Sequence, residues 1–145
     1  RYRALHWEGG LDEYLQLVER QPQLARNAWQ RLVDMIESFG SVPPSADGRV
    51  RRRWKLFDDP LGGGHDAVFG LDGPLDTLVQ TLRAGALGLG PERRVILLHG
   101  PVGSAKSTIV RLLKRGLEHY SRTDDGALYT FYWDVDGERV DSAMH

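Results

Sequence analysis

Cysteine is absent from the 145 residues of the chain, which excludes a disulfide-bonded scaffold and thiolate metal sites. This absence fits a reducing compartment, and we expect a cytoplasmic protein. No apolar run approaches the ~18 residues of a membrane span, so no membrane partner is expected. Nineteen basic and twenty acidic residues leave a net charge of -1, and we therefore expect no nucleic-acid partner either.

The composition that is present describes a folded chain. Hydrophobic residues make up 41% of the sequence and charged residues 27%, a balance that supports a core and argues against disorder. We expect an N-terminal helical segment with a short basic strand over 1–57, a linker over 58–68, and a second unit over 69–145. Because the chain begins with Arg1 and ends with His145, we expect both ends to be cuts in a longer protein.

Apolar residues recur at helical spacing in four places. The first two helices are expected over 11–18 and 24–39, and Gly40 is the expected stop of the second. A third helix follows Asp72, a residue type that caps helices well. The fourth spans Lys106–Tyr120, with apolar residues along one face. The N-terminal half is therefore expected to be mainly helical.

Strand signals are fewer and lie mostly in the second half. Val95–Leu98 is a continuous apolar run, typical of a strand buried on both faces of a parallel sheet. Residues 128–135 are rich in aromatics and predict another strand, which Asp136-Gly137 would turn toward residues 138–140. A basic strand-like piece is expected over 49–57. Strands alternating with helices predict an α/β fold.

A glycine-containing loop, GPVGSAKST, joins the apolar run to the fourth helix. A buried strand, a tight turn and a helix N-terminus together direct backbone N–H groups and the helix dipole toward a phosphate. Lys106 is expected to reach the β- and γ-phosphates, and the Ser107 hydroxyl to bind Mg²⁺. ATP with Mg²⁺ is the expected ligand, and the residues expected to hold it are Gly100, Pro101, Val102, Gly103, Ser104, Ala105, Lys106, Ser107 and Thr108.

Ala105 departs from the usual G-x-x-x-x-G-K-[ST] pattern, in which glycine precedes the lysine. A methyl group at this position lies close to the path of the phosphates and is expected to weaken their binding. Because the residue opens a helix, we expect it to adopt right-handed dihedral angles, which alanine tolerates.

Six segments, which together extend over almost the whole sequence, carry a family resemblance. They are His6-Trp7-Glu8-Gly9 with Tyr14-Leu15, Phe69-Gly70-Leu71-Asp72, Val95-Ile96-Leu97-Leu98, GPVGSAKST, Leu112-Leu113-Lys114-Arg115-Gly116-Leu117-Glu118, and Arg122-Thr123-Asp124-Asp125-Gly126-Ala127-Leu128-Tyr129. These segments resemble the N-terminal AAA domain of the PrkA family of serine protein kinases.

The resemblance implies a P-loop NTPase core of the AAA type, of which residues 69–145 would be the truncated start. It implies that the full protein is an ATP-dependent serine/threonine protein kinase with a separate kinase-like region, or an ATP-dependent protease. A protein substrate and a homo-oligomeric ring are implied as partners. Phe69 and Gly70 would contact the adenine, the alternative being a hydrophobic staple at the start of the helix.

Other interpretations of the same residues stay open. Asp134 and Asp136 follow an apolar run and imitate a Walker B carboxylate, or they end a strand with a turn. The basic run 49–55 is a phosphate-steering or nucleic-acid patch, or a solvated strand edge. No kinase signature is present, so this chain alone is expected to be inactive. The function could also be that of a non-enzymatic regulatory or oligomerisation module with a weakened loop, or of another AAA ATPase.

Overall fold

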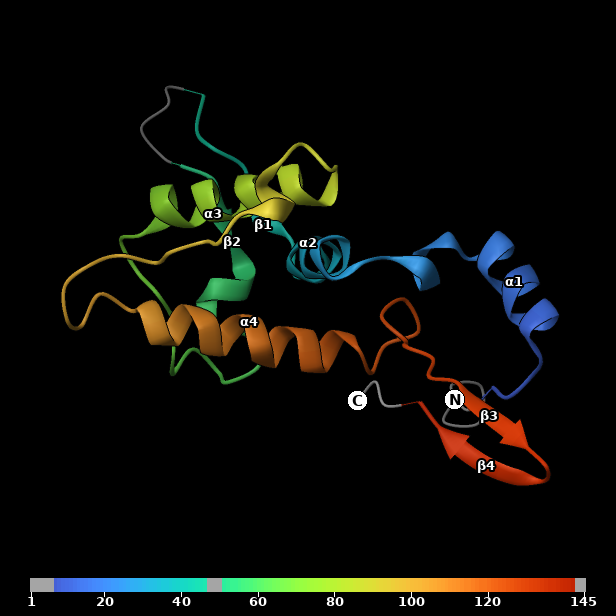
Figure 1. The fold of residues 1–145 in the computed structure, drawn as a ribbon. Coiled ribbons are helices and arrows are strands. Elements are labelled where there is room, and N and C mark those ends of the chain that lie inside the picture. Colours follow the sequence, from blue (N-terminus) through green and yellow to red (C-terminus); the bar gives the residue numbers. More distant parts are fainter. Residues whose placement is uncertain (1–6, 47–50, 143–145) are drawn as a thin grey trace.

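Figure 1 presents a computed structural model of the chain, which describes residues 7–46 and 51–142. The sequence predictions that involve His6, Arg49 and Val50 therefore lie outside the described residues. The elements are α1 (Leu11–Arg20), η1 (Pro22–Ala25), α2 (Ala28–Ser38), β1 (Ser41–Val42), β2 (Arg53–Trp54), η2 (Lys55–Asp58), α3 (Asp72–Ala86), η3 (Pro91–Arg93), α4 (Lys106–Tyr120), β3 (Tyr132–Val135) and β4 (Glu138–Asp141).

The four predicted helices are all present, with two changes at their starts. The second helix begins at Ala28 because Asn27 caps it: the Asn27 Oδ1 accepts from the Gln30 N–H over 3.0 Å, and the Gln30 Oε1 accepts from the Asn27 N–H over 3.0 Å. The predicted cap of α3 is wrong. Leu71 occupies the cap position without a side-chain bond, and Asp72 is the first helical residue.

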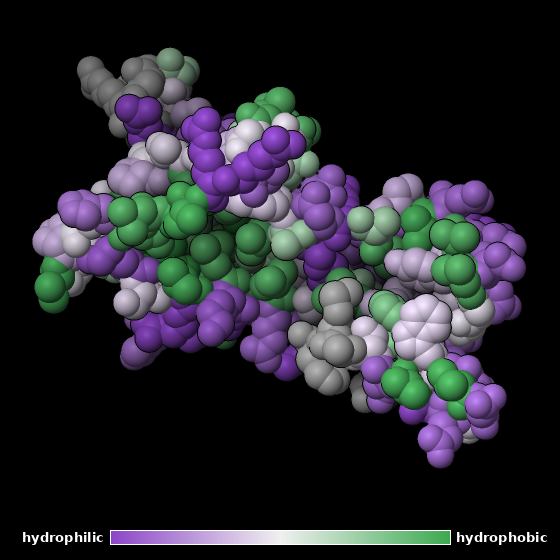
Figure 2. Space-filling view, viewed as in Figure 1, coloured by the Kyte–Doolittle hydropathy of each residue, from purple (hydrophilic) through white to green (hydrophobic). Residues whose placement is uncertain are grey.

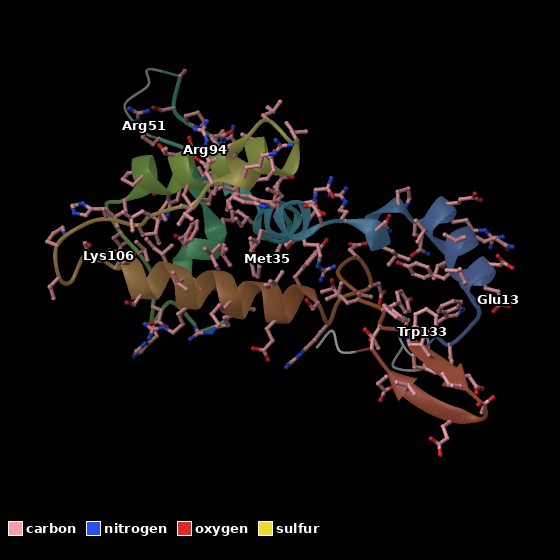
Figure 3. The ribbon with its side chains drawn as sticks, viewed as in Figure 1. Glu13, Met35, Arg51, Arg94, Lys106 and Trp133 are labelled. Atoms are coloured by element: carbon pink, nitrogen blue, oxygen red, sulfur yellow. The ribbon has the colours of Figure 1, made fainter. Side chains whose placement is uncertain are left out.

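The core lies where α2, α3, α4 and η2 meet. In Figure 3, Met35 lies between α2 and α4. Side chains on both sides of the predicted 58–68 boundary share this core, while the division into separate units stays a prediction. The buried core residues are Val33, Met35, Ile36, Trp54, Leu56, Phe57, Val68, Leu75, Val79, Leu82, Ile109, Leu112 and Tyr120.

Gly116 marks the closest contact between α4 and the rest of the core. A Cβ atom at this position would lie 2.7 Å from the Met35 Sδ and 2.8 Å from the Leu56 Cδ1. Both neighbours are buried, so neither can move into solvent. We expect Gly116→Ala to lower the free energy of unfolding by about 1–2 kcal/mol, because overpacking outweighs the better helix propensity of alanine.

Urea denaturation of the Gly116→Ala variant measures this effect, and Gly73→Ala is its control. A Cβ at Gly73 meets nothing within 4 Å in the first turn of α3. The control is expected to be unchanged or to gain up to about 1 kcal/mol. Equal stability of the two variants would contradict the tight crossing of α4 over Met35 and Leu56.

The predicted strand Val95–Leu98 is not a strand in this structure. Val95 is 93% exposed and Leu97 81% exposed, and the segment has no ladder partner among the described residues. A parallel strand forms only when neighbouring strands accept and donate its backbone hydrogen bonds. Among residues 7–46 and 51–142 the sheets are two antiparallel pairs, β1–β2 and β3–β4. Figure 2 shows apolar side chains on the surface between α3 and α4.

The predicted C-terminal hairpin is confirmed in a shorter form. Its first strand begins at Tyr132, and β3 pairs with β4 so that Val135 lies opposite Glu138. Asp136 and Gly137 have φ angles of 54° and 84°, the left-handed pair that a tight two-residue turn requires. Of residues 51–57, the described part of the predicted basic strand, Arg53–Trp54 forms a strand and pairs with β1. The chain then turns into η2.

Candidate functional site

The loop predicted to bind phosphate directly precedes α4. Residues 95–100 approach it without regular structure, residues 102–105 form a turn, and α4 begins at Lys106. Its tip faces solvent, with Val102 fully exposed. The first N–H groups of a 15-residue helix lack intrahelical partners and carry the positive end of the helix dipole. The structure therefore brings the predicted loop and a helix N-terminus together.

The ammonium group of Lys106 lies against the loop itself. Its Nζ donates to the carbonyl oxygens of Gly100 over 2.8 Å and Pro101 over 2.6 Å, and to the Ser104 Oγ over 3.0 Å. Ser104 also closes the turn, because its Oγ donates to the Pro101 carbonyl over 2.8 Å. In Figure 3 Lys106 stands at the loop end of α4. Loop and lysine thus form one unit around a positive charge.

Ala105 corrects the expectation about its backbone. It is the cap residue of α4 and has φ 58° and ψ 12°, in the left-handed region. The right-handed geometry begins only at Lys106, because the turn must reverse the chain before the helix starts. Alanine in this region loses roughly 1–2 kcal/mol to contact between its Cβ and the backbone, whereas glycine does not. The conformation explains physically why the usual pattern has glycine here.

We expect Ala105→Gly to raise the free energy of unfolding by about 0.5–1 kcal/mol, the relief of strain less the extra entropy of unfolded glycine. Thermal unfolding followed by circular dichroism measures it. The matched control is Ala84→Gly within α3, where the same change is expected to cost about 1 kcal/mol. Two losses of equal size would contradict the left-handed conformation of Ala105.

The predicted magnesium ligand lies in the first turn of α4. Ser107 is exposed at the helix start beside Lys106. Thr108 is half-buried, and its Oγ1 accepts from the Arg111 Nη2 over 3.3 Å. Within the described part of the chain, no group of three or more His, Asp or Glu side chains is arranged to hold a metal ion.

Phe69 and Gly70 lie just before α3. Phe69 is 71% exposed, so its ring packs little against the helix, which argues against a hydrophobic staple. Gly70 has a φ of 74°, where a residue with a Cβ would be strained. The preceding Val68 is buried, and its N–H donates to the Phe57 carbonyl over 2.8 Å. The ring therefore projects from a fixed backbone.

Asp59 is a buried carboxylate that supports α4, the helix at the candidate site, and the sequence did not predict this role. Its side chain is fully buried in the predicted linker and accepts from the Gly62 N–H, the Asp66 N–H and the Arg115 Nη1 over 3.0, 2.9 and 2.9 Å. The pKa of Asp59 is lowered, chiefly by the hydrogen bond from the Asp66 N–H. The Gly62 N–H and the Arg115 guanidinium lower this pKa further, whereas burial of the carboxylate raises it and offsets part of the effect. Aspartate directly before a glycine-rich segment otherwise suggests an exposed loop.

Two arginines of α4 connect this segment to the helix that begins at the loop. Arg115 donates to both Asp59 and Asp66, the latter over 3.1 Å. One turn nearer the loop, the Arg111 Nη2 donates to the Asp66 Oδ1 over 3.0 Å and to Thr108. Residues 59–66 are therefore bonded to the second and third turns of α4.

The carboxylates that imitate a Walker B motif belong to the hairpin turn. The Asp134 Oδ1 accepts from the Gly137 N–H over 3.0 Å, and Asp136 takes the left-handed turn position. In Figure 3 Trp133 of this hairpin and Lys106 stand at opposite ends of the molecule. The hairpin residues are exposed throughout. These observations favour the turn interpretation.

Two arginines of the basic run, Arg52 and Arg53, have partners within the chain. Arg52 donates to the Ser41 Oγ over 3.1 Å and lies over the Trp54 ring, and Arg53 pairs with Asp58. Internal partners and neighbouring acidic groups are typical of a solvated strand edge. Among the described residues, no helix is long and apolar enough to cross a membrane.

A glycine loop whose lysine begins a helix is the arrangement that P-loop proteins use. The sequence profile of the family described as the PrkA AAA domain matches residues 9–136, most of the chain. The chain belongs to the PrkA AAA domain family. This membership is consistent with nucleotide binding.

Individual relatives agree with this assignment. The chain is 38% identical over 128 residues to the ATP-dependent protease PrkA of Bacillus subtilis (strain 168), a match that covers 88% of this chain and 18% of the relative. It is 27% identical over 107 residues to the serine/threonine kinase YeaG of Escherichia coli (strain K12), covering 72% of this chain and 16% of that protein. The chain thus spans less than a fifth of these two relatives. A comparison with solved structures gives no match.

Proposed function

We propose that this chain is the ATP-binding P-loop segment of a PrkA-like serine/threonine protein kinase and binds ATP with Mg²⁺ through residues 100–108. The observation that carries the proposal is the unit of glycine loop, Lys106 ammonium and α4 N-terminus. Backbone N–H groups, a helix dipole and a lysine are the groups that P-loop proteins use for the phosphates of a nucleotide.

Three residues of the loop have separate parts in the proposed binding. Gly103, with a φ of 83° and open space where a Cβ would be, leaves room for a phosphate to approach the backbone. Lys106 neutralises phosphate charge after exchanging its bonds to the Gly100 and Pro101 carbonyls for bonds to phosphate oxygens. The exposed Ser107 hydroxyl would be the protein ligand of Mg²⁺, which, when bound, stabilises charge on the transferred phosphoryl group.

Turnover needs more than the loop supplies. The proposed activity of the full protein, phosphoryl transfer to a protein substrate or ATP hydrolysis, requires an acidic group and an in-line nucleophile near the γ-phosphate. The Asp134 carboxylate accepts a hydrogen bond within the hairpin turn, and Asp136 occupies the left-handed position of the same turn. We propose that residues 1–145 alone turn over ATP negligibly, and that the full protein acts as a cytoplasmic homo-oligomer.

The direct test is calorimetric titration with ATP in the presence and absence of Mg²⁺, followed by the same titration with AMP. Binding of ATP that strengthens with Mg²⁺, together with much weaker binding of AMP, is the expected result because the loop holds the β- and γ-phosphates. If ATP and AMP bound equally, or neither bound, the phosphate loop would not be the site. An ATPase rate near one per second from residues 1–145 would contradict the proposed inactivity of this part.

A second candidate function is a non-enzymatic regulatory or oligomerisation module, and the strained Ala105 is the observation that favours it. A loop that carries a Cβ in the left-handed region loses some of the backbone freedom with which glycine adapts to a phosphate. The relative from Bacillus subtilis is described as an ATP-dependent protease, which gives a third possibility for the full protein. Weak ATP binding that is insensitive to Lys106 would favour the regulatory module.

A further inference from the structure

Arg53 is held rigidly beside the exposed ring of Phe69. Its backbone pairs with Val42 in the β1–β2 ladder. Its Nε donates to the Asp58 Oδ1 over 2.8 Å, and its Nη2 lies 2.6 Å from the same oxygen. An arginine side chain has several rotatable bonds, and these contacts select one position for the guanidinium. That position is fixed by two elements, β2 and η2.

The guanidinium faces the Phe69 ring. The Arg53 Cζ lies 5.4 Å from the ring centroid, within the range of cation–π attraction. An isolated exposed aromatic residue needs no special explanation. The Phe69 ring, however, is 71% exposed and is also held in one orientation by a fixed cation, so most of its surface is available for contact with a ligand. Two nitrogen atoms of the Arg53 guanidinium are bonded to Asp58, and the group lies against the Phe69 ring. We therefore expect Arg53 to orient this ring and not to bind a ligand directly.

The segment that carries Phe69 lies beside the start of α4. Asp66, three residues earlier, accepts from Arg111, and Arg111 also donates to Thr108 at the end of the loop. Three residues of chain span at most about 10 Å, so Phe69 lies within this reach of Asp66, which is bonded to α4 through Arg111 and Arg115. Figure 1 shows the connection from η2 to α3 passing this end of the helix. A nucleotide held by its phosphates at the loop could therefore place its base on the ring.

We propose that Arg53 is a positioning residue that holds Phe69 as a stacking platform for the base of a bound nucleoside triphosphate. The inference rests on the proposed function of the loop and extends it to a residue outside the loop. The guanidinium covers part of one face of the ring and fixes its tilt, and the base stacks on the exposed part. Stacking of this kind tolerates different bases, because every base has a π-face.

This role is tested by calorimetric titration with two probes, ATP and inorganic tripolyphosphate. The protein used is the full-length chain that contains residues 1–145. We expect Arg53→Ala to weaken ATP binding roughly tenfold while tripolyphosphate affinity changes less than about twofold, because only ATP carries a base to stack. Arg51→Ala removes the same charge from an exposed neighbour and is expected to leave both affinities unchanged. Asp58→Asn, which loosens the guanidinium without removing it, is expected to weaken ATP binding about threefold with tripolyphosphate unchanged.

The outcomes distinguish the role of Arg53 from the proposed nucleotide binding by the loop. Equal weakening of ATP and tripolyphosphate would give Arg53 a merely structural role and overturn the inference, as would unchanged ATP binding in Arg53→Ala. If Arg53→Ala does not fold, the Asp58→Asn result decides in the same way. Wild-type protein that binds neither probe would overturn the proposed function itself. Wild-type protein that binds both, with no base-selective loss in the variants, would overturn only the role of Arg53.

Discussion

Replacing Lys106 by alanine is expected to weaken ATP binding roughly a hundredfold, which corresponds to about 3 kcal/mol. The ammonium lies within the loop, bonded to the carbonyl oxygens of Gly100 and Pro101, where it would contact a phosphate bound by the loop. Its removal leaves the phosphates to the backbone N–H groups and the helix dipole alone. Titration with a fluorescent ATP analogue measures the change in dissociation constant.

The matched control for this prediction is Lys114→Ala. Lys114 is an exposed lysine on the same helix, two turns from the loop, so the change removes the same charge from α4. We expect an affinity within about twofold of the wild type, since the charge is solvated and screened. Equal affinity of wild type and Lys106→Ala would remove the loop from the binding site and support the regulatory module.

The second large effect is expected at Asp59. Asp59→Ala would leave the Gly62 and Asp66 N–H groups and the Arg115 guanidinium without their shared acceptor inside the protein. Breaking a buried pair in this way is strongly destabilising, and we expect the melting temperature to fall by roughly 10 °C. Asp124→Ala, at an exposed position in the turn after α4, is the control and is expected to change it by less than about 2 °C. Similar melting temperatures of the two variants would contradict the role of Asp59.

The same residue predicts a dependence of stability on pH. Because the folded-state pKa of Asp59 is lowered, chiefly by the hydrogen bond from the Asp66 N–H, the stability it contributes is fully present above its unfolded pKa of about 4. It is lost as the pH falls through the lowered value. Asp59→Asn keeps a residue that tolerates the left-handed φ of 54° but does not titrate. Its melting temperature is expected to fall less than that of the wild type between about pH 4 and pH 2.

Local patterns in the sequence predicted the helices well and the sheet poorly. The limits of α4 follow from the loop before it and from apolar spacing, both of which are properties of neighbouring residues. The apolar run Val95–Leu98 was expected to be a buried strand, but a strand depends on partners elsewhere, and the described residues supply none. Apolar character alone therefore did not determine whether this segment pairs.

The geometry around the candidate site was likewise predicted only in part, and the binding role of its residues stays a prediction. GPVGSAKST predicted a turn that leads directly into a helix at Lys106, and the structure has both, because the residues that determine them lie close together in the sequence. The backbone of Ala105 was predicted wrongly, since the turn before the helix determines it rather than the helix. Asp59 was missed because its burial depends on Arg115, 56 residues away. The pairing of Arg53 with Phe69 is likewise made by folding and could not be predicted from spacing.

The packing of Met35, Leu56 and Phe57 beneath α4 limits how this segment can be shortened or transplanted. A chain cut to begin at residue 69 would keep every residue of the phosphate loop. It would also lack α2 and η2, which pack against α4, and would therefore expose part of the buried face of α4 that carries Ile109 and Leu112. Grafting the loop and α4 onto another protein therefore requires either α2 and η2 as well, or a new set of apolar side chains that covers the buried face of α4.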